Sequence, residues 1–262
     1  MTALEDPSTN ISSSFMKDGY YLARQVFSDA RLRNMENDFD RVVEQLESSG
    51  ENINARWDTE QMDELDGGES KIIHTHNVHR YSACWLRAFQ DDQFLDVAEQ
   101  ILGPDIILHH SKLFQKPPRE GAPFPIHQDW WYFPTDKDSM IAAIIFLTDA
   151  DDESGGLRVY PGSHKLGKQE NSSGLESSEL LAKYPLEDAE AITAKRGDVL
   201  FFSYFTLHGS TPNRSDQFRK TVLVQLHSGN DYVLPNDAVN HVNEQLVLRG
   251  WNHHMTRDLA SE

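Results

Sequence analysis

Short apolar segments separated by turn residues fill the second half of the chain, and this pattern most constrains the fold. The predicted strands cover residues 105–116, 140–147, 157–160, 192–194, 199–202, 206–210 and 218–227. Pro117, Gly155 and Gly197 stand between them, and residues of these two types commonly end strands. Because no helical pattern alternates with the strands, we expect a sandwich or barrel rather than a parallel α/β sheet.

The first hundred residues carry the main helical signals. A short helix ending at Gly19 and a strand over residues 20–26 are expected first. Apolar residues then recur at steps of three and four after Ser28, a residue type favoured at helix N-caps. Residues 91–102 form a second amphipathic helix that ends before Gly103. These helices predict a layer packed against one face of the strands.

The length of 262 residues fits a single large domain. We expect residues 1–104 to give helical support, 105–228 to form the catalytic β core and 229–262 to be a C-terminal extension. Within the last part, residues 239–248 are predicted to be helical. The polar stretch 164–190, with one weak helix near Leu180, is predicted to leave the sheet and form a lid.

The composition excludes several classes of partner. Lysine and arginine total 24 and the acids 42, giving a net charge of −18, which opposes binding to nucleic acid or anionic membranes. Cys84 is the single cysteine, so a reducing compartment is favoured. We find no signal-peptide pattern and no run of the ~18 apolar residues that a membrane span needs. The expectation is a cytoplasmic protein with a small-molecule substrate.

A His-x-Asp pair, His127 and Asp129, lies in an apolar and aromatic stretch, and His208 follows far downstream. Residues two apart on a strand point to the same side, so one metal can bind both. Two histidines and a carboxylate are typical of non-haem Fe(II) oxygenases, which leave other positions for a cosubstrate and dioxygen. A keto-acid cosubstrate carries a remote carboxylate, for which Arg219 and Ser210 are candidate partners.

Other interpretations of these residues are weighed against this one. Taken alone, His127 is more often a hydrogen-bonded core histidine than a ligand. His74 and His76 lie two apart on a predicted strand, but no Cys, Asp or Glu completes a second metal site there. Hydrogen-bonded or solvated histidines are therefore the preferred interpretation of that pair. The order of His127 and Asp129, then His208 and Ser210, then Arg219 is what favours a catalytic metal site.

The chain resembles the phytanoyl-CoA dioxygenase family of Fe(II)/2-oxoglutarate-dependent oxygenases over about residues 14–228. The resemblance is carried by Gln115-Lys116-Pro117-Pro118, Pro125-Ile126-His127-Gln128-Asp129, Tyr132-Phe133-Pro134, Gly155-Gly156-Leu157, Pro161-Gly162-Ser163-His164-Lys165, Gly197-Asp198, Leu207-His208-Gly209-Ser210, Asn213 and Arg219. It implies a mainly β fold with flanking helices, the cupin-like jelly roll called a double-stranded β-helix.

The same resemblance implies roles for individual residues. His127, Asp129 and His208 are expected to be the catalytic iron ligands. The expected 2-oxoglutarate contacts are Arg219, Ser210, Lys112 and Gln128. Because Asp129 retains the carboxylate that halogenating relatives lack, hydroxylation is the expected reaction.

The substrate wall is expected to begin directly after the His-x-Asp pair. The candidate residues are Trp130, Trp131, Tyr132, His74 and His110, with Trp57 as a further possibility. A coenzyme A thioester would need a basic patch that the sequence does not show, so a small metabolite is expected. Two other classes stay open: a jelly-roll metal-binding protein with a vestigial site, and a cupin-like metalloenzyme that does not use 2-oxoglutarate.

Overall fold

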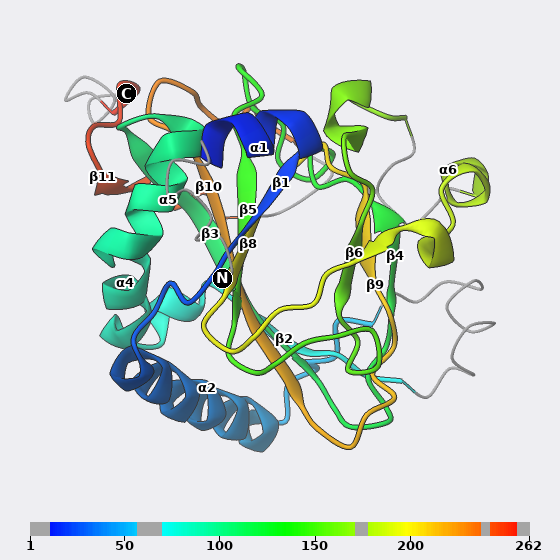
Figure 1. Ribbon diagram of the computed structural model, residues 1–262. Coiled ribbons are helices and arrows are strands. Elements are labelled where there is room, and N and C mark those ends of the chain that lie inside the picture. The colour runs from blue at the N-terminus through cyan, green and yellow to red at the C-terminus, as the bar shows by residue number, and fades with distance from the viewer. Residues whose placement is uncertain (1–10, 57–69, 171–177, 237–241, 256–262) are drawn as a thin grey trace, which may run out of the picture.

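A computed structural model describes residues 11–56, 70–170, 178–236 and 242–255, which form two antiparallel sheets (Figure 1). The large sheet has the order β1-β8-β5-β10-β3-β11, with β2 also paired to β3. Its strands are β1 Tyr20–Ala23, β2 Ile73–His76, β3 Ile106–Lys116, β5 Ile141–Phe146, β8 Val199–Ser203, β10 Arg219–Ser228 and β11 Leu246–Arg249. This is the predicted mainly β architecture with flanking helices.

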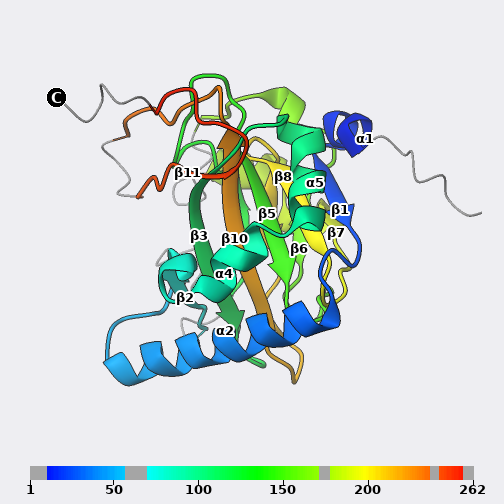
Figure 2. The same cartoon turned by 90° about the vertical axis from the view of Figure 1, so that its left-hand side faces the viewer.

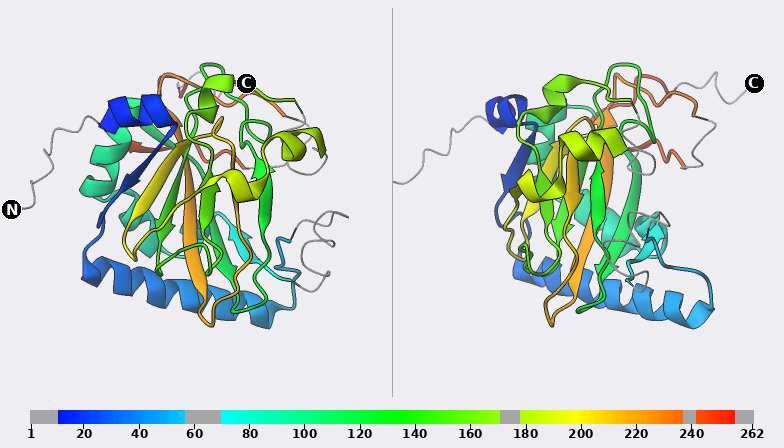
Figure 3. Two further views of the ribbon diagram at one scale, coloured as in Figure 1. Left: turned by 45° about the vertical axis from the view of Figure 1, so that its right-hand side comes forward. Right: turned by 90° about the vertical axis from the view of Figure 1, so that its right-hand side faces the viewer.

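The small sheet has the order β4-β9-β6-β7 and lies beside the large one in Figure 1. Its strands are β4 Phe124–His127, β6 Leu157–Val159, β7 Glu190–Ala191 and β9 His208–Ser210. Within the described residues, Ile126 and Leu207 of this region pack with Leu180 of α6 Ser178–Lys183. The α6 helix therefore covers the outer side of the small sheet (Figure 3). The expected weak helix near Leu180 is confirmed.

Helices cover the outer face of the large sheet (Figure 2). They are α1 Ile11–Asp18, α2 Asp29–Ser49, α4 Ala83–Phe89 and α5 Asp92–Leu102. Ser28 caps α2 by accepting a hydrogen bond from the Arg31 backbone nitrogen at 3.3 Å, and Gly50 ends this helix at φ 72°. The predicted apolar stripe from Leu32 to Leu46 is buried. None of the described helices has the length and apolarity that a membrane span requires.

The large sheet has an apolar core on each face. In β5, Ile141, Ala143 and Ile145 belong to the cluster packed under the helices. Ala142, Ile144 and Phe146 alternate with them and face the cluster that contains residues of the small sheet. Every residue of β5 is buried, as expected for a strand covered on both faces. The second core is the layer in which a cavity opens.

Two expectations about the elements need correction, and one helix was missed. Residues 246–249 form the edge strand β11, where a helix was predicted; Leu246 and Val247 pair with the start of β3, which no local pattern reveals. The strand expected at 192–194 forms at β7 Glu190–Ala191. The α4 helix, which Ser82 caps, was not predicted. The strands expected over residues 20–26 and around His74 are confirmed as β1 and β2 of the large sheet.

Candidate active site

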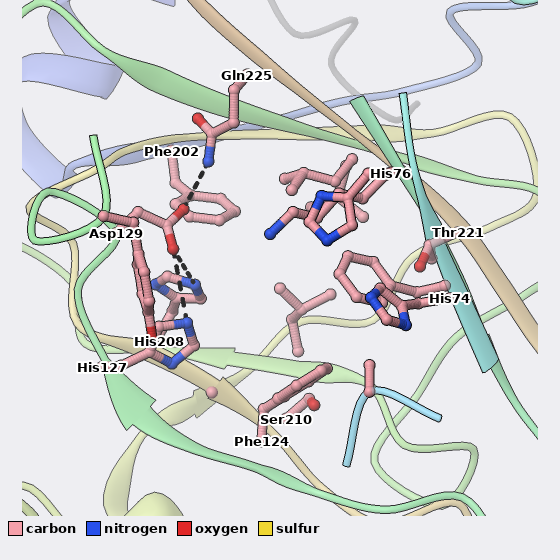
Figure 4. Close-up of a pocket in the computed structure, with 18 of the residues that line it drawn as sticks. His74, His76, Phe124, His127, Asp129, Phe202, His208, Ser210, Thr221 and Gln225 are labelled. Carbon is pink, nitrogen blue, oxygen red and sulfur yellow. Dashed lines mark hydrogen bonds and ion pairs between the residues drawn. The ribbon is translucent and has the colours of Figure 1, made fainter. Parts of the chain in front are cut away.

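A cavity of about 300 Å³ lies between the two sheets (Figure 4). The small sheet and its loops contribute one wall, and β2, β3, β5, β8 and β10 contribute the others. Its lining comprises Ala55, His74, His76, Lys112, Phe114, Phe124, His127, Asp129, Tyr132, Phe133, Ile144, Leu157, Phe202, His208, Gly209, Ser210, Arg219, Thr221, Leu223 and Gln225. Both the predicted metal ligands and Arg219 therefore face the same space.

His127, Asp129 and His208 converge at one end of this cavity (Figure 4). His127 and His208 are partners in the register of β4 and β9. Asp129 Oδ1 lies 3.6 Å from His127 Nε2 and 3.8 Å from His208 Nε2. All three side chains are buried, and one donor atom from each lies within 4.8 Å of the others. Among the described residues this is the cluster that can hold a metal ion.

Backbone carbonyls fix the orientation of both imidazoles. His127 Nδ1 lies 2.8 Å from Pro125 O, and His208 Nδ1 lies 3.0 Å from Thr206 O. A carbonyl only accepts, so each Nδ1 carries the proton and donates it. Each Nε2 is then left with its lone pair facing Asp129, which is the tautomer that a metal ligand needs. Burial, together with the charge of His127, lowers the pKa of His208 to about 4, so this imidazole is neutral near pH 7.

Gln225 holds the carboxylate of Asp129. Its Nε2 donates to Asp129 Oδ2 at 2.8 Å, which leaves Oδ1 for the two imidazoles and an ion. Burial acts to raise the pKa of Asp129, but electrostatic attraction to His208, hydrogen bonding and attraction to His127, and the hydrogen bond from Gln225 hold it below its ordinary value. Two neutral imidazole nitrogens and one ionised carboxylate oxygen form a donor set that suits Fe(II). Gln225 was not predicted from the sequence.

Arg219 lies on the large sheet and is 3% exposed. Its Nη1 donates to Thr221 Oγ1 at 2.7 Å, while its Nε has no hydrogen-bond partner among the described residues. Burial lowers the pKa of Arg219 to about 10, so the guanidinium is still charged at pH 7. A buried cation with an unused N–H group is a receptor for a carboxylate. This fits the remote carboxylate of a keto acid.

Lys116 lies behind this receptor and was predicted only as part of a motif. It is fully buried, and its Nζ donates to Ser210 Oγ at 2.7 Å and to Thr211 O at 2.6 Å. Since Ser210 Oγ accepts from Lys116, its own hydroxyl proton is free to be donated to a ligand. Burial, and then the charge of Arg219, hold the pKa of Lys116 well below its usual range. The register of β3 and β10 pairs Lys116 with Arg219.

Three further predicted site residues line the cavity, namely Lys112, Tyr132 and His74. Burial, with the charge of Asp129, raises the pKa of Tyr132, so its hydroxyl keeps its proton. His74 and His76 face the cavity as a pair with ring centroids 5.2 Å apart. Within the described residues, no carboxylate or thiolate joins this pair to make a second metal cluster.

Gln128 is placed away from the cavity, which corrects the expected cosubstrate contact. Its Nε2 donates to Phe205 O at 2.6 Å and to Gly167 O at 3.0 Å, and its Oε1 accepts from Gln169 N at 3.0 Å. Strand alternation explains this placement, because the residue between two ligands points to the opposite side. Gln128 thus anchors the segment after β6 to the metal-binding strand.

Three predicted substrate residues also lie outside the cavity lining. Trp130 packs with Phe133 and Tyr204 and has Lys168 Nζ 5.8 Å from its ring. Trp131 contacts the Tyr132 ring edge-on, and His110 is buried against Phe133. The backbone turns after Asp129, so the alternation that would aim successive side chains at the cavity ends there. Trp57 lies outside the described residues.

A jelly roll whose cavity brings together two histidines, a carboxylate and a buried arginine defines the class of non-haem oxygenases that use Fe(II), 2-oxoglutarate and dioxygen. Residues 15–221 match the family model described as phytanoyl-CoA dioxygenase (PhyH). The chain therefore belongs to the phytanoyl-CoA dioxygenase family and is an Fe(II)/2-oxoglutarate-dependent dioxygenase.

Individual relatives agree with this membership. A probable alpha-ketoglutarate-dependent hypophosphite dioxygenase of Stutzerimonas stutzeri is 29% identical over 220 residues, covering 80% of this chain and 75% of that one. The ectoine dioxygenase of Bordetella parapertussis is 27% identical over 239 residues, covering 82% and 73%. The solved structure of the non-heme alpha ketoglutarate dependent carbocyclase SnoK, from nogalamycin biosynthesis, superposes with a TM-score of 0.72 at 21% identity, covering 89% and 88%. The last comparison supports the jelly-roll fold.

Proposed function

We propose that His127, Asp129 and His208 bind Fe(II), and that Arg219 and Ser210 bind the remote carboxylate of 2-oxoglutarate. The observation that carries this proposal is that both sets of side chains face one cavity. The three ligand atoms lie within 4.8 Å of one another, and Arg219 Nε is buried without a partner among the described residues. Burying a charge without a partner costs free energy. A buried guanidinium with an unpaired N–H group therefore favours a working site over a vestigial one.

The reaction proposed at this site is the hydroxylation of a C–H bond. One molecule of 2-oxoglutarate and one of dioxygen convert R–H to R–OH and release succinate and carbon dioxide. One oxygen atom enters the alcohol and the other enters succinate, so the two electrons lost by 2-oxoglutarate and the two lost by the substrate together reduce dioxygen. Bound Fe(II) supplies the redox chemistry that activates dioxygen.

The protein side chains position the reactants and exclude water. Gln225 keeps Asp129 Oδ2 occupied, which presents a single carboxylate oxygen to the metal. Lys116 orients the Ser210 hydroxyl toward the cosubstrate. Phe202 and Phe124 add apolar walls around the cavity. Tyr132, which keeps its proton, also lines the cavity.

The substrate is proposed to be a small molecule. A cavity of about 300 Å³ is at the lower end of ligand pockets and must also hold the five-carbon cosubstrate. The named relatives fit such a size, since one is a hypophosphite and another an ectoine dioxygenase. We further propose one catalytic domain with residues 105–228 as its core, acting in the cytoplasm, where the single Cys84 stays reduced.

The test is to add Fe(II) and 2-oxoglutarate without oxygen and to record the weak visible charge-transfer band of the chelate. The wild type should develop the band, and His127→Ala should lose it. Candidate metabolites are then screened for substrate-dependent release of succinate in air. Oxygen uptake that needs no 2-oxoglutarate would instead identify a cupin-like metalloenzyme, and a wild type without the band would contradict the proposal.

A further inference from the structure

The charge of the cavity contrasts with that of the chain. The protein carries a net charge of −18, yet among the described lining residues the only carboxylate is Asp129. Two basic side chains that are charged at pH 7, Lys112 and Arg219, face the same space, and His74 and His76 lie beside them. An acidic protein that keeps an electropositive cavity concentrates anions in that cavity.

The charges of the proposed complex leave one cation without a counter-charge. The two charges of Fe(II) match those of 2-oxoglutarate, and the charge of Arg219 matches that of Asp129. Lys112 remains, and no described residue forms a hydrogen bond or ion pair with its Nζ. Its side chain is half-buried where it faces the cavity, and the acid whose charge acts on it is Asp129, whose oxygens are already engaged. A cation kept in this way needs an anionic ligand.

Lys112 also lies in the right part of the cavity for a substrate. The antiparallel register of β2 and β3 places His76 opposite Lys112 and His74 opposite Phe114. His74 and His76 lie on the wall across the cavity from His127, Asp129 and His208 (Figure 4). A substrate bound between these two walls would therefore lie next to the metal ligands. His76 is exposed, so this wall reaches the mouth of the cavity.

Lys112 is separate from the receptor for the cosubstrate. In the β3 and β10 register, Arg219 pairs with Lys116, whereas Lys112 pairs with Leu223, four residues further along β10. Four residues of a strand span roughly 13 Å. One carboxylate of 2-oxoglutarate is assigned to Arg219 and the other to the metal, so neither is left for Lys112.

We propose that Lys112, with His76 at the cavity mouth, binds an anionic group of the primary substrate and thereby orients its C–H bond toward the metal. The group is a carboxylate or an oxyanion of phosphorus or sulfur. This assignment rests on the proposed function and replaces the cosubstrate contact that the family resemblance implied for Lys112. It makes Lys112 a residue that determines substrate specificity.

The test measures anion binding by calorimetry on protein loaded with Fe(II) and 2-oxoglutarate in the absence of oxygen. Acetate and inorganic phosphite are the anionic probes, and acetamide is the neutral probe of matched size, all at constant ionic strength. The wild type should bind at least one anion saturably and acetamide at least tenfold more weakly. Lys112→Met should weaken anion binding at least tenfold, while the exposed-lysine control Lys17→Met should leave it unchanged.

Three outcomes separate this inference from the proposed function. A wild type that fails to form the 2-oxoglutarate chelate band refutes the proposed function. A wild type that forms the band but binds neither anion refutes only the role of Lys112. If Lys112→Met weakens 2-oxoglutarate and leaves anion binding intact, Lys112 is a cosubstrate residue and the inference is wrong. The folded state of Lys112→Met is checked by thermal unfolding, where its Tm should equal or exceed that of the wild type, because a half-buried charge without a counter-charge is removed.

Discussion

The two sheets position their functional side chains by different means. The small sheet has short strands, and its histidines are fixed locally: each Nδ1 bonds the carbonyl two residues upstream. The large sheet has β3 and β10, of 11 and 10 residues, and its cations are fixed by long-range register and burial. The first arrangement sets the tautomer and direction of metal ligands, and the second sets the spacing of charged receptors along a rigid wall.

Metal binding and the recognition of cosubstrate and substrate therefore depend on largely separate parts of the fold. Substitutions of the small-sheet histidines should abolish metal binding, whereas those of the large-sheet cations should leave the metal bound and change which ligands bind next to it. Two residues connect the sheets: Gln225 extends from β10 to Asp129, and Ser210 of β9 accepts from Lys116 of β3 beside the cosubstrate receptor. Four predictions test this division, beginning with the largest expected effect.

Replacing either small-sheet histidine should abolish the metal site. In His127→Ala or His208→Ala, loss of one of three protein donors should reduce turnover by on the order of a thousandfold or more. Calorimetric titration with Fe(II) under anaerobic conditions measures the lost affinity. The control is His253→Ala, a histidine 51% exposed in its side chain that bonds Asp105. Normal iron affinity in both active-site variants would show that the small-sheet histidines do not hold the metal.

Replacing the large-sheet arginine should spare the metal and weaken the cosubstrate. Arg219→Met removes charge-assisted hydrogen bonds worth about 1.5–3 kcal/mol each, so the dissociation constant of 2-oxoglutarate should rise roughly 100-fold. Titration of the chelate band measures this constant, and Fe(II) affinity is measured on the same protein. Arg33→Met, at an exposed position of α2, is the matched control. Should Arg219→Met lose iron instead, the two sheets would not be separable.

Gln225→Leu should give an intermediate effect. The substitution keeps the volume of the side chain but frees Asp129 Oδ2, so the carboxylate loses its fixed orientation. Loss of such an outer hydrogen bond typically lowers metal affinity about 10–100-fold. The same Fe(II) titration detects this change, and the exposed Gln45→Leu serves as control. An unchanged affinity would show that the small sheet holds the metal without help from β10.

The smallest expected effect is a pH dependence of anion binding. Burial lowers the pKa of Lys112 to about 8, and the charge of Asp129 opposes the shift. Lys112 is therefore charged below that pH and neutral above it, so acetate, which stays anionic throughout, should bind progressively more weakly above pH 8. His74 and Arg219 also face the cavity, but burial lowers the pKa of His74, so it is already neutral at pH 8–9, where Arg219 is still charged. Lys112→Arg should remove the dependence in titrations from pH 7 to 9.5, and a wild-type affinity that is flat over this range would contradict the assignment.

Local patterns predicted the small-sheet part of the site well. The two-residue spacing of His127 and Asp129 places both on one side of the chain, and the structure brings them to His208. The same alternation argues against a cavity position for Gln128, which the family resemblance had suggested. Trp130 and Trp131 were misplaced because the chain turns after Asp129, and no sequence pattern fixed the direction of that turn.

The large-sheet part depends on pairing between distant strands, and the sequence alone does not determine that register. Lys116 belonged to a visible Lys-Pro-Pro motif, but its position beside Arg219 follows from the pairing of β3 with β10. Gln225 was discoverable in principle, since it lies on the same strand face as Arg219. The edge strand β11 was predicted as a helix because its partner, the start of β3, is far away in the chain.

The pairing of β1 with β8 has a consequence for the order of folding during synthesis. Tyr20 lies opposite Phe202 in the register, so β1 is synthesised long before the strand with which it pairs. Contacts between residues so far apart in sequence form slowly, because the chain loses the entropy of the intervening loop before the contacts stabilise it. The central strand β10 arrives later still. A nascent chain stopped before residue 219 therefore lacks the strand that joins β3 to β5, and it exposes apolar sheet edges that chaperones bind.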